Sequence, residues 1–383
     1  MPYVETEEQQ MLRKQVRAIG EKYGRDYYMK KAEAGLSPDE LWSEVAAQGF
    51  IGVNTPEEYG GGGLGIYELA IVCEELAAAG CPLLLLLVSP AICATVIAQF
   101  GTEGQKERWL PKLASGEMKM AFAITEPNAG SNSHRLETAA TKDGDDWLLS
   151  GTKYYISGAD TADAILVVAR TGGSEDGRGR LSLFIVDTDA AGLEKTLIKM
   201  AIPGADRQFT LFFDNVRLSA DRLVGNEGQG LAQVFVGLNP ERILGAALAN
   251  GAALHAIEQA SRYANERAVW GKPIGAHQGI AHPLAQAKIE IELARLMTRK
   301  AAWLFDQDLD AGEAANMAKY AAGEAATHAV DTAIQVHGGN GMSDEYGLVS
   351  LWALARTLRI APVSREMILN YVGQHTLKLP KSY

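Results

Sequence analysis

The sequence is poor in cysteine and in metal-binding patterns. Its 383 residues include only Cys73, Cys81 and Cys93, which form no Cys-x-x-Cys pair. We therefore expect neither a disulfide framework nor a zinc site, and a reducing compartment fits this cysteine usage. The seven histidines show no His-Glu-x-x-His or related spacing, so no metal is expected.

Long apolar runs and an excess of positive charge are also missing. The longest apolar run, Leu83 to Val88, is far shorter than the roughly 20 residues that cross a bilayer. The net charge of −11 argues against a nucleic-acid surface, which needs clustered Lys and Arg. Residues 1–10 are acidic and polar, so we expect no signal peptide, no membrane association and a cytoplasmic location.

A dinucleotide-binding fingerprint is not found either. The glycines in Gly225-x-x-Gly228-x-Gly230 have the wrong spacing and no suitable strand before them. We interpret this stretch as a loop, and a Rossmann domain is not indicated.

Three segments with different residue patterns are present. Apolar residues recur at three- and four-residue spacing in the first, short β runs fill the second, and long Ala-rich helical periods fill the third. We predict a mainly α protein with a central β domain. The domains would be an N-terminal all-α domain (1–117), a small β-barrel-like middle domain (118–230) and a C-terminal four-helix bundle (231–383). The clearest predicted helices are 67–79, 251–268, 286–305 and 311–337, and the clearest strands are 147–155, 164–169, 181–186 and 209–213.

Two turns in the β segment carry groups that could bind a ligand. The stretch from Phe122 to Ser133 leaves a strand and turns through Gly130, exposing backbone N–H groups and the hydroxyls of Thr125 and Ser131. Such donors suit a flavin ring or a pyrophosphate. The alternative is an ordinary Asn-Ala-Gly-Ser turn.

The second turn follows another predicted strand. Tyr155 and Ser157 are two residues apart, which places both side chains on one face of a regular strand. Tyr155 could stack on an aromatic ring while Ser157 donates to a ring heteroatom. A core tyrosine beside a solvated serine is the alternative.

The order of four motifs resembles that of the acyl-CoA dehydrogenase family. The motifs are Thr125 to Ser131, Tyr155-Ile156-Ser157, Arg267 to Gly271 with Gln278, and Gln335 to Gly341. They are spread over nearly the whole chain. The departures are Tyr155 and Trp270, where the family usually has Trp and Phe, and both keep an aromatic face.

The resemblance implies a flavoprotein that binds FAD. It assigns the flavin ring and pyrophosphate to Phe122, Thr125, Gly130, Ser131, Tyr155 and Ser157. The FAD of a neighbouring subunit would be reached by Arg267, Trp270 and Gln278, and its adenosine end by Gln335, Gly338 and Gly339. Shared FAD in turn implies a homo-oligomer, with a homotetramer (a dimer of dimers) as the expected state.

The family's reaction needs a carboxylate base near the substrate α-carbon, while the β-hydrogen leaves as hydride to flavin N5. Most members place this base after the glycine-rich turn, where this chain has Pro362 or Arg365, with Glu366 one residue too late. The isovaleryl-CoA and long-chain types use a Glu directly before an Arg. Glu241-Arg242 fills that position, so we expect Glu241 to be the base. This placement favours branched or longer acyl chains, by analogy only.

The local structure around Glu241 has two interpretations. Asn239 could be the N-cap and Pro240 the first residue of a helix, with Glu241 favoured there by the helix dipole. If the helix begins near Leu231, Pro240 instead kinks it and can re-aim Glu241 into a cavity. We assign Ser131, Asn239 and Arg242 to substrate binding.

These observations favour an FAD-dependent acyl-CoA dehydrogenase that desaturates an acyl-CoA thioester and passes electrons to an electron-transfer flavoprotein. One alternative keeps the fold but reacts with O₂, as a flavin oxidase or monooxygenase. The other is a non-catalytic partner subunit of a hetero-oligomer, which would be expected to lose flavin contacts.

Overall fold

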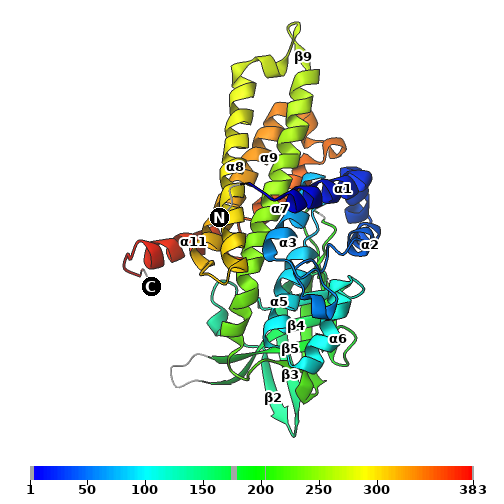
Figure 1. Cartoon of the computed structure of the whole chain (residues 1–383), viewed down its shortest axis with the longest axis vertical. Coiled ribbons are helices and arrows are strands. Elements are labelled where there is room, and N and C mark those ends of the chain that lie inside the picture. Colours follow the sequence, from blue (N-terminus) through cyan, green and yellow to red (C-terminus); the bar gives the residue numbers. More distant parts are fainter. Residues whose placement is uncertain (1–3, 174–178, 203, 382–383) are drawn as a thin grey trace. The chain divides into compact units, whose positions relative to one another are not determined.

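The computed structural model describes residues 4–173, 179–202 and 204–381. Their contacts divide the chain into two units (Figure 1). The first unit comprises residues 4–31, 66–83 and 242–381, and the second comprises residues 32–65 and 84–241. The predicted fold class is confirmed, since helical segments flank a central sheet along the chain.

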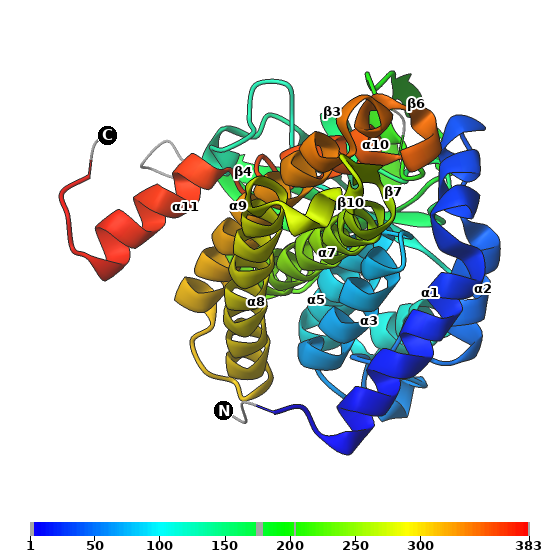
Figure 2. The same ribbon diagram turned by 90° about the horizontal axis from the view of Figure 1, so that it is seen from above.

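The first unit is helical. Its helices are α1 Glu7–Glu33, α3 Ile66–Ala78, the part of α7 Gly230–Glu266 that follows Glu241, α8 Gln278–Asp306, α9 Gly312–His337, α10 Leu348–Thr357 and α11 Arg365–Tyr371. α8 and α9 lie side by side (Figure 2). A short hairpin of β9 Ala268–Val269 and β10 Lys272–Pro273 follows α7.

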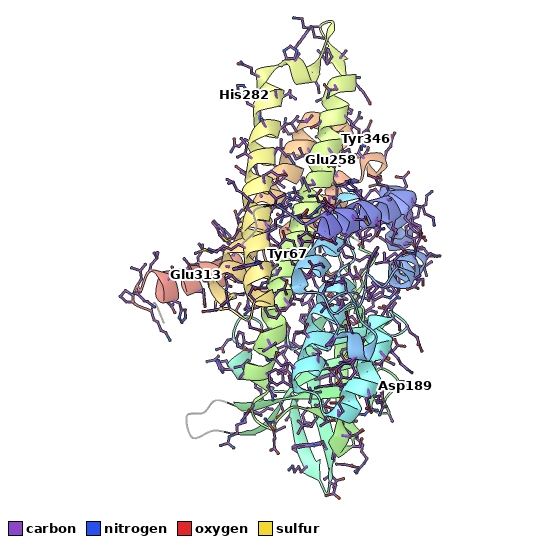
Figure 3. The ribbon with its side chains drawn as sticks, viewed as in Figure 1. Tyr67, Asp189, Glu258, His282, Glu313 and Tyr346 are labelled. Carbon is purple, nitrogen blue, oxygen red and sulfur yellow. The ribbon has the colours of Figure 1, made fainter. Side chains whose placement is uncertain are left out.

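Alanine and glycine allow these helices to approach closely. Ala287, Ala294 and Ala301 are buried along α8 at seven-residue spacing, which places them on nearly one helix face. The start of α3 is capped from α8, because Asp306 accepts the N–H groups of Ile66 (2.8 Å) and Tyr67 (2.9 Å; Tyr67 is labelled in Figure 3). Orphan N–H groups at a helix start are thereby satisfied.

The closest helix contact is at Gly251, and it makes a test of the packing. A Cβ atom there would lie 2.3 Å from the carbonyl oxygen of Glu74 and 2.6 Å from Ala77 Cβ. We expect Gly251→Ala to lower the free energy of unfolding by about 1–3 kcal/mol, because the two backbones must separate. Gly279→Ala is the control, since no described atom lies within 4 Å of the place that its added methyl group would take. Thermal unfolding of both variants measures this, and equal midpoints would contradict the packing described.

The second unit packs helices on a sheet. The helices are α2 Asp39–Ala47, α4 Leu85–Val88, α5 Thr95–Phe100 and α6 Glu103–Ala114, and a π-helical segment, Ser89–Ala94, joins α4 to α5. The expected barrel-like domain is one eight-stranded sheet in the order β6-β7-β3-β2-β4-β5-β8, with β1 beside β4. Its strands are β1 Met120–Ala123, β2 Ala139–Asp143, β3 Asp146–Ser157, β4 Ala164–Gly173, β5 Gly179–Asp187, β6 Leu193–Ile198, β7 Gln208–Leu218 and β8 Leu223–Val224.

The sheet has apolar residues on both faces. One face and the helices share a core that includes Cys93, Met120 and Leu166, and the other buries residues such as Ala121, Ile165 and Phe184. Alternate residues of β1 and β4 therefore enter different cores. This double burial holds β1, and the turn that follows it, in a fixed place.

Candidate active site

The turn after β1 is the first part of the site. Glu126 and Ala129 exchange two backbone hydrogen bonds of 3.1 Å, which close the turn. Thr125 is half-buried, whereas Gly130 and Ser131 are exposed, and no described atom lies within 4 Å of a Cβ placed on Gly130. Phe122 packs against the core beneath. The turn is thus held by the core on one side and exposed on the other, as a turn that binds a ligand must be.

The end of β3 is the second part, and it differs from the regular strand that we expected. The register with β7 shifts between Lys153 and Ile156, which marks a β-bulge, and Tyr155 has φ 57°. A bulge inserts one unpaired residue and re-aims its side chain. Tyr155 is 49% exposed and lies edge-on to the Tyr154 ring at 4.4 Å, so the alternative of a core tyrosine is wrong.

These two parts lie against each other. The Tyr154 N–H donates to the carbonyl oxygen of Thr125 at 2.8 Å. Ser157 Oγ donates to Gln208 Oε1 at 3.0 Å. The structure thus brings the hydroxyls of Thr125 and Ser157 and the ring of Tyr155 onto neighbouring segments of one unit.

A buried ion pair beneath the turn was missed at the level of sequence. Lys153 is fully buried and its Nζ lies 2.8 Å from Glu126 Oε1. A lysine in an alternating strand gives no signal of such a partner, because the two residues are 27 positions apart.

Glu241 lies inside a helix, not at its start. α7 begins at Gly230, so the interpretation of Asn239 as an N-cap is wrong, and the helix starts where the second interpretation places it. Pro240 has no N–H to donate to the preceding turn of the helix. Glu241 itself is half-buried.

The first part of α7 packs on the π-helical segment. A Cβ on Gly237 would lie 3.0 Å from side-chain carbons of Ile92 and Val96, so the helices touch there. π-Helical turns are frequent at functional sites. Here the widened turn carries Cys93, whose thiol lies 3.5 Å from the carbonyl oxygen of Ala121 in β1.

The position of Cys93 locates Glu241 relative to the sheet. Burial, and then the negative charge of Glu241, raise the pKa of the Cys93 thiol. The Glu241 carboxyl is therefore close to a thiol that itself touches β1, the strand that leads into Thr125. Glu241 and the Thr125 turn, both predicted site residues of this unit, therefore lie near the same strand, β1.

The other predicted site residues belong to the first unit or lie beside Glu241. Arg267, Gln278, Gln335, Gly338 and Gly339 are exposed, and Trp270 is 89% exposed with φ 51°. Gln335 lies in the last turn of α9, and Gly338–Met342 form a 3-10 turn. Asn239 and Arg242 are half-buried, and the charge of Arg242 acts on Tyr371.

His337, within the glycine-rich motif from Gln335 to Gly341, is a packing residue. It is buried, it stacks on Tyr263 with ring centroids 4.3 Å apart, and its Nδ1 lies 2.7 Å from the carbonyl oxygen of Ala333. Within the described residues, no group of three or more His, Cys, Asp or Glu side chains could hold a metal ion. No helix in the described part of the chain is long and apolar enough to cross a bilayer.

The alternative base positions are in a different setting. Pro362 lies between α10 and α11, and Arg365 and Glu366 begin α11. Arg365 pairs with Glu324 at 3.0 Å, and the Glu366 side chain is 71% exposed.

Comparison with known proteins gives the family. The models of the acyl-CoA dehydrogenase N-terminal, middle and C-terminal domains match residues 6–117, 121–216 and 228–377. Acyl-CoA dehydrogenase FadE12 of Mycobacterium tuberculosis is 56% identical over 100% of this chain and 99% of its own length.

Comparison with solved structures indicates the same family. A glutaryl-coenzyme A dehydrogenase in complex with glutaryl-CoA is 34% identical, with a TM-score of 0.94 over 100% of this chain and 98% of that one. Butyryl-CoA dehydrogenase of Megasphaera elsdenii is 31% identical, with a TM-score of 0.93 over 98% and 100%. The expected cofactor class is confirmed by a glutaryl-CoA dehydrogenase of Mycobacterium smegmatis in complex with FADH2, which is 26% identical, with a TM-score of 0.91 over 99% and 97%. Because three domain models and a relative at 56% identity cover nearly every residue, the chain belongs to the acyl-CoA dehydrogenase family.

Proposed function

We propose that this chain is an FAD-dependent dehydrogenase of acyl-CoA thioesters in which Glu241 removes the α-proton. The observation that carries the proposal is the half-buried Glu241 carboxyl, close to Cys93 and thereby to β1, which leads into the Thr125 turn. A carboxylate in a partly water-excluded place is a suitable general base.

The donors of the second unit fit FAD. Hydroxyls of Thr125, Ser131 and Ser157, with the open backbone at Gly130, match the needs of a flavin ring and pyrophosphate. Phe122 supports the turn and Tyr155 supplies an aromatic face. Arg267, Trp270 and Gln278 would reach the FAD of a neighbouring subunit, and Gln335, Gly338 and Gly339 would hold the adenosine end. When bound, FAD would accept the β-hydrogen of the substrate as hydride.

The chain's own groups account for the proton and for binding. Glu241 takes the α-proton and must be ionised in the free enzyme. Arg242, the next residue, orients Glu241 or contacts the thioester arm, because its guanidinium offers several donors at fixed geometry. Asn239 and Ser131 complete the substrate contacts. The anionic CoA would need local cations, because the net charge of the chain is −11.

The remaining assignments belong to this proposal. The domains are 1–117, 118–230 and 231–383, the electron acceptor is an electron-transfer flavoprotein, and the enzyme acts in the cytoplasm.

A homo-oligomer is supported by an exposed apolar face of α8. Ile289 (61% exposed), Leu293 (62%) and Leu296 (44%) are spaced four and three residues apart, so they form one stripe. We expect Ile289→Asp with Leu293→Asp to reduce the oligomer size and to weaken FAD retention. Lys288→Glu, a charge change about 100° around the same helix from Ile289, is the control, because the Lys288 side chain is 50% exposed. Light scattering and the flavin absorbance after gel filtration measure both, and an unchanged oligomer in the double variant would contradict this interface.

The direct test of the function uses the purified chain. Its flavin spectrum is recorded, and it is then assayed with straight, branched and ring-bearing acyl-CoA thioesters and an artificial electron acceptor. We expect a yellow protein that oxidises at least one thioester. A colourless protein that binds no added FAD would overturn the proposal. Rapid reoxidation of the reduced flavin by air would indicate an oxidase instead.

A further inference from the structure

Lys153 is one of the largest fully buried side chains of the described residues, and it is charged when paired. Its Nζ donates to Glu126 Oε1 at 2.8 Å and to the carbonyl oxygen of Ile124 at 3.0 Å. Lys153 thus reaches from β3 to the two residues on either side of Thr125.

Glu126 in turn connects the Thr125 turn to the start of β2. Its Oε1 accepts the N–H of Thr138 at 3.0 Å, and its Oε2 accepts the N–H of Glu137 at 2.6 Å. Its own backbone closes the turn with Ala129. One carboxylate therefore holds three segments: the turn, the approach to β2 and, through Lys153, β3.

Lys153 also stands immediately before the β-bulge. It is the last residue of β3 in regular register with β7, opposite Leu211, before the shift that ends at Ile156. Because its side chain points inward, the following extra residue lets Tyr155 turn outward. The direction of the Tyr155 ring thus depends on where Lys153 is held.

Burying such an ion pair costs free energy, because both charged groups lose their contact with water. Burial lowers the pKa of Lys153 to about 8, against the opposing effect of Glu126. Burial raises the pKa of Glu126, but Lys153 and the Glu137 N–H lower it more. Apolar residues of similar volume often give equal or greater stability than a buried ion pair. The stability of the fold alone therefore gives little reason for an ion pair at this position. The contacts of Lys153 and Glu126 indicate that the pair sets the geometry of the segments around it.

We propose that Lys153 and Glu126 are positioning residues that fix the Thr125 turn and the Tyr155–Ser157 bulge at the separation that a flavin ring requires. This inference rests on the proposed function, because both segments are assigned to FAD. Both side chains are buried, at 0% and 4% exposure, so they would act through these two segments and not by contact with the cofactor.

The test compares FAD affinity with the stability of the apoprotein. Lys153→Met leaves Glu126 buried without its cation, so we expect a lower midpoint of thermal unfolding and weaker FAD binding. The double variant Lys153→Met with Glu126→Gln removes both charges, so we expect it to recover much of the midpoint. Its dissociation constant for FAD should still rise about tenfold or more, a change of about 1.4 kcal/mol. The visible circular dichroism of its bound flavin should also change.

The matched control is another ion pair of the same unit. Arg222 makes two hydrogen bonds to Asp187, and neither residue belongs to a flavin segment. Arg222→Met should lower the unfolding midpoint and leave the FAD dissociation constant and the flavin dichroism unchanged. The inference is overturned if the double variant binds FAD as the wild type does, or if Arg222→Met weakens FAD binding as much. Failure of the wild type itself to bind FAD would instead remove the proposed function.

Discussion

Replacing Glu241 by Gln should lower the rate of acyl-CoA dehydrogenation by about 10²–10⁴-fold, the usual contribution of a general base. Gln has the shape of Glu but cannot accept the α-proton at neutral pH. Because the flavin turn and the bulge are built by other residues, the variant stays yellow. Turnover with an artificial acceptor, divided by bound flavin, measures the effect.

The matched control for this variant is Glu366→Gln. Glu366 is the acid nearest in sequence to the other base position, but its side chain is 71% exposed at the start of α11. We expect nearly wild-type turnover from it. A large loss of turnover in Glu366→Gln together with a small loss in Glu241→Gln would instead assign the base to the C-terminal position.

The second large effect concerns a buried ionic network in the first unit. Glu74 of α3 accepts hydrogen bonds from Arg13 of α1 (2.6 Å) and from Arg295 of α8 (2.8 Å), so it ties three helices together. Its side chain is only 6% exposed. Glu74→Gln removes the carboxylate that Arg13 and Arg295 share, although Arg13 keeps Glu5 and Glu75 and Arg295 keeps Glu292. We therefore expect a loss of about 2–3 kcal/mol in the free energy of unfolding.

The same network predicts a pH dependence. Burial alone would raise the pKa of Glu74, but Arg295 and Arg13 lower it to about 2 from 4.5. A carboxyl whose pKa is lower in the folded state stabilises the fold above the unfolded pKa, and this contribution is lost as the pH falls through the folded pKa. The wild type should therefore lose roughly 3 kcal/mol from this group between pH 4.5 and 2.

Denaturant unfolding across that pH range tests both statements. Glu74→Gln should show a flatter pH profile than the wild type. The control is Glu292→Gln, because Glu292 pairs with Arg295 at 3.0 Å but is 43% exposed, and we expect it to cost less than about 1 kcal/mol. Equal losses in the two variants would mean that burial does not set the strength of this network.

Periodicity and composition were enough to predict several elements of the fold. The predicted helix 67–79 is α3 Ile66–Ala78, and the predicted strand 181–186 lies within β5 Gly179–Asp187. The start of α7 could not be predicted, because Pro240 is as typical of a first helical turn as it is unfavourable inside a helix. Packing of Gly237 on the π-helical segment favours the longer helix, and such tertiary contacts override local propensity.

Site residues could be predicted only where a short stretch of sequence contains a recognisable motif. The turn at Thr125 and the Glu241-Arg242 pair are visible in the sequence, and their assignment as site residues stays a prediction. The β-bulge at Tyr155 is not visible, since one extra residue changes the face of a side chain without changing the composition of the strand. Lys153 and Glu126 were missed for a related reason, because only the folded sheet brings them together.

The central claim is that the Glu241 carboxyl takes the substrate α-proton. Anaerobic mixing of an acyl-CoA substrate with the flavin-loaded wild type and with Glu241→Gln tests it in a single turnover. We expect the yellow absorption of the wild type to bleach, while the variant binds the thioester and stays yellow. Bleaching of the variant at the wild-type rate would contradict it.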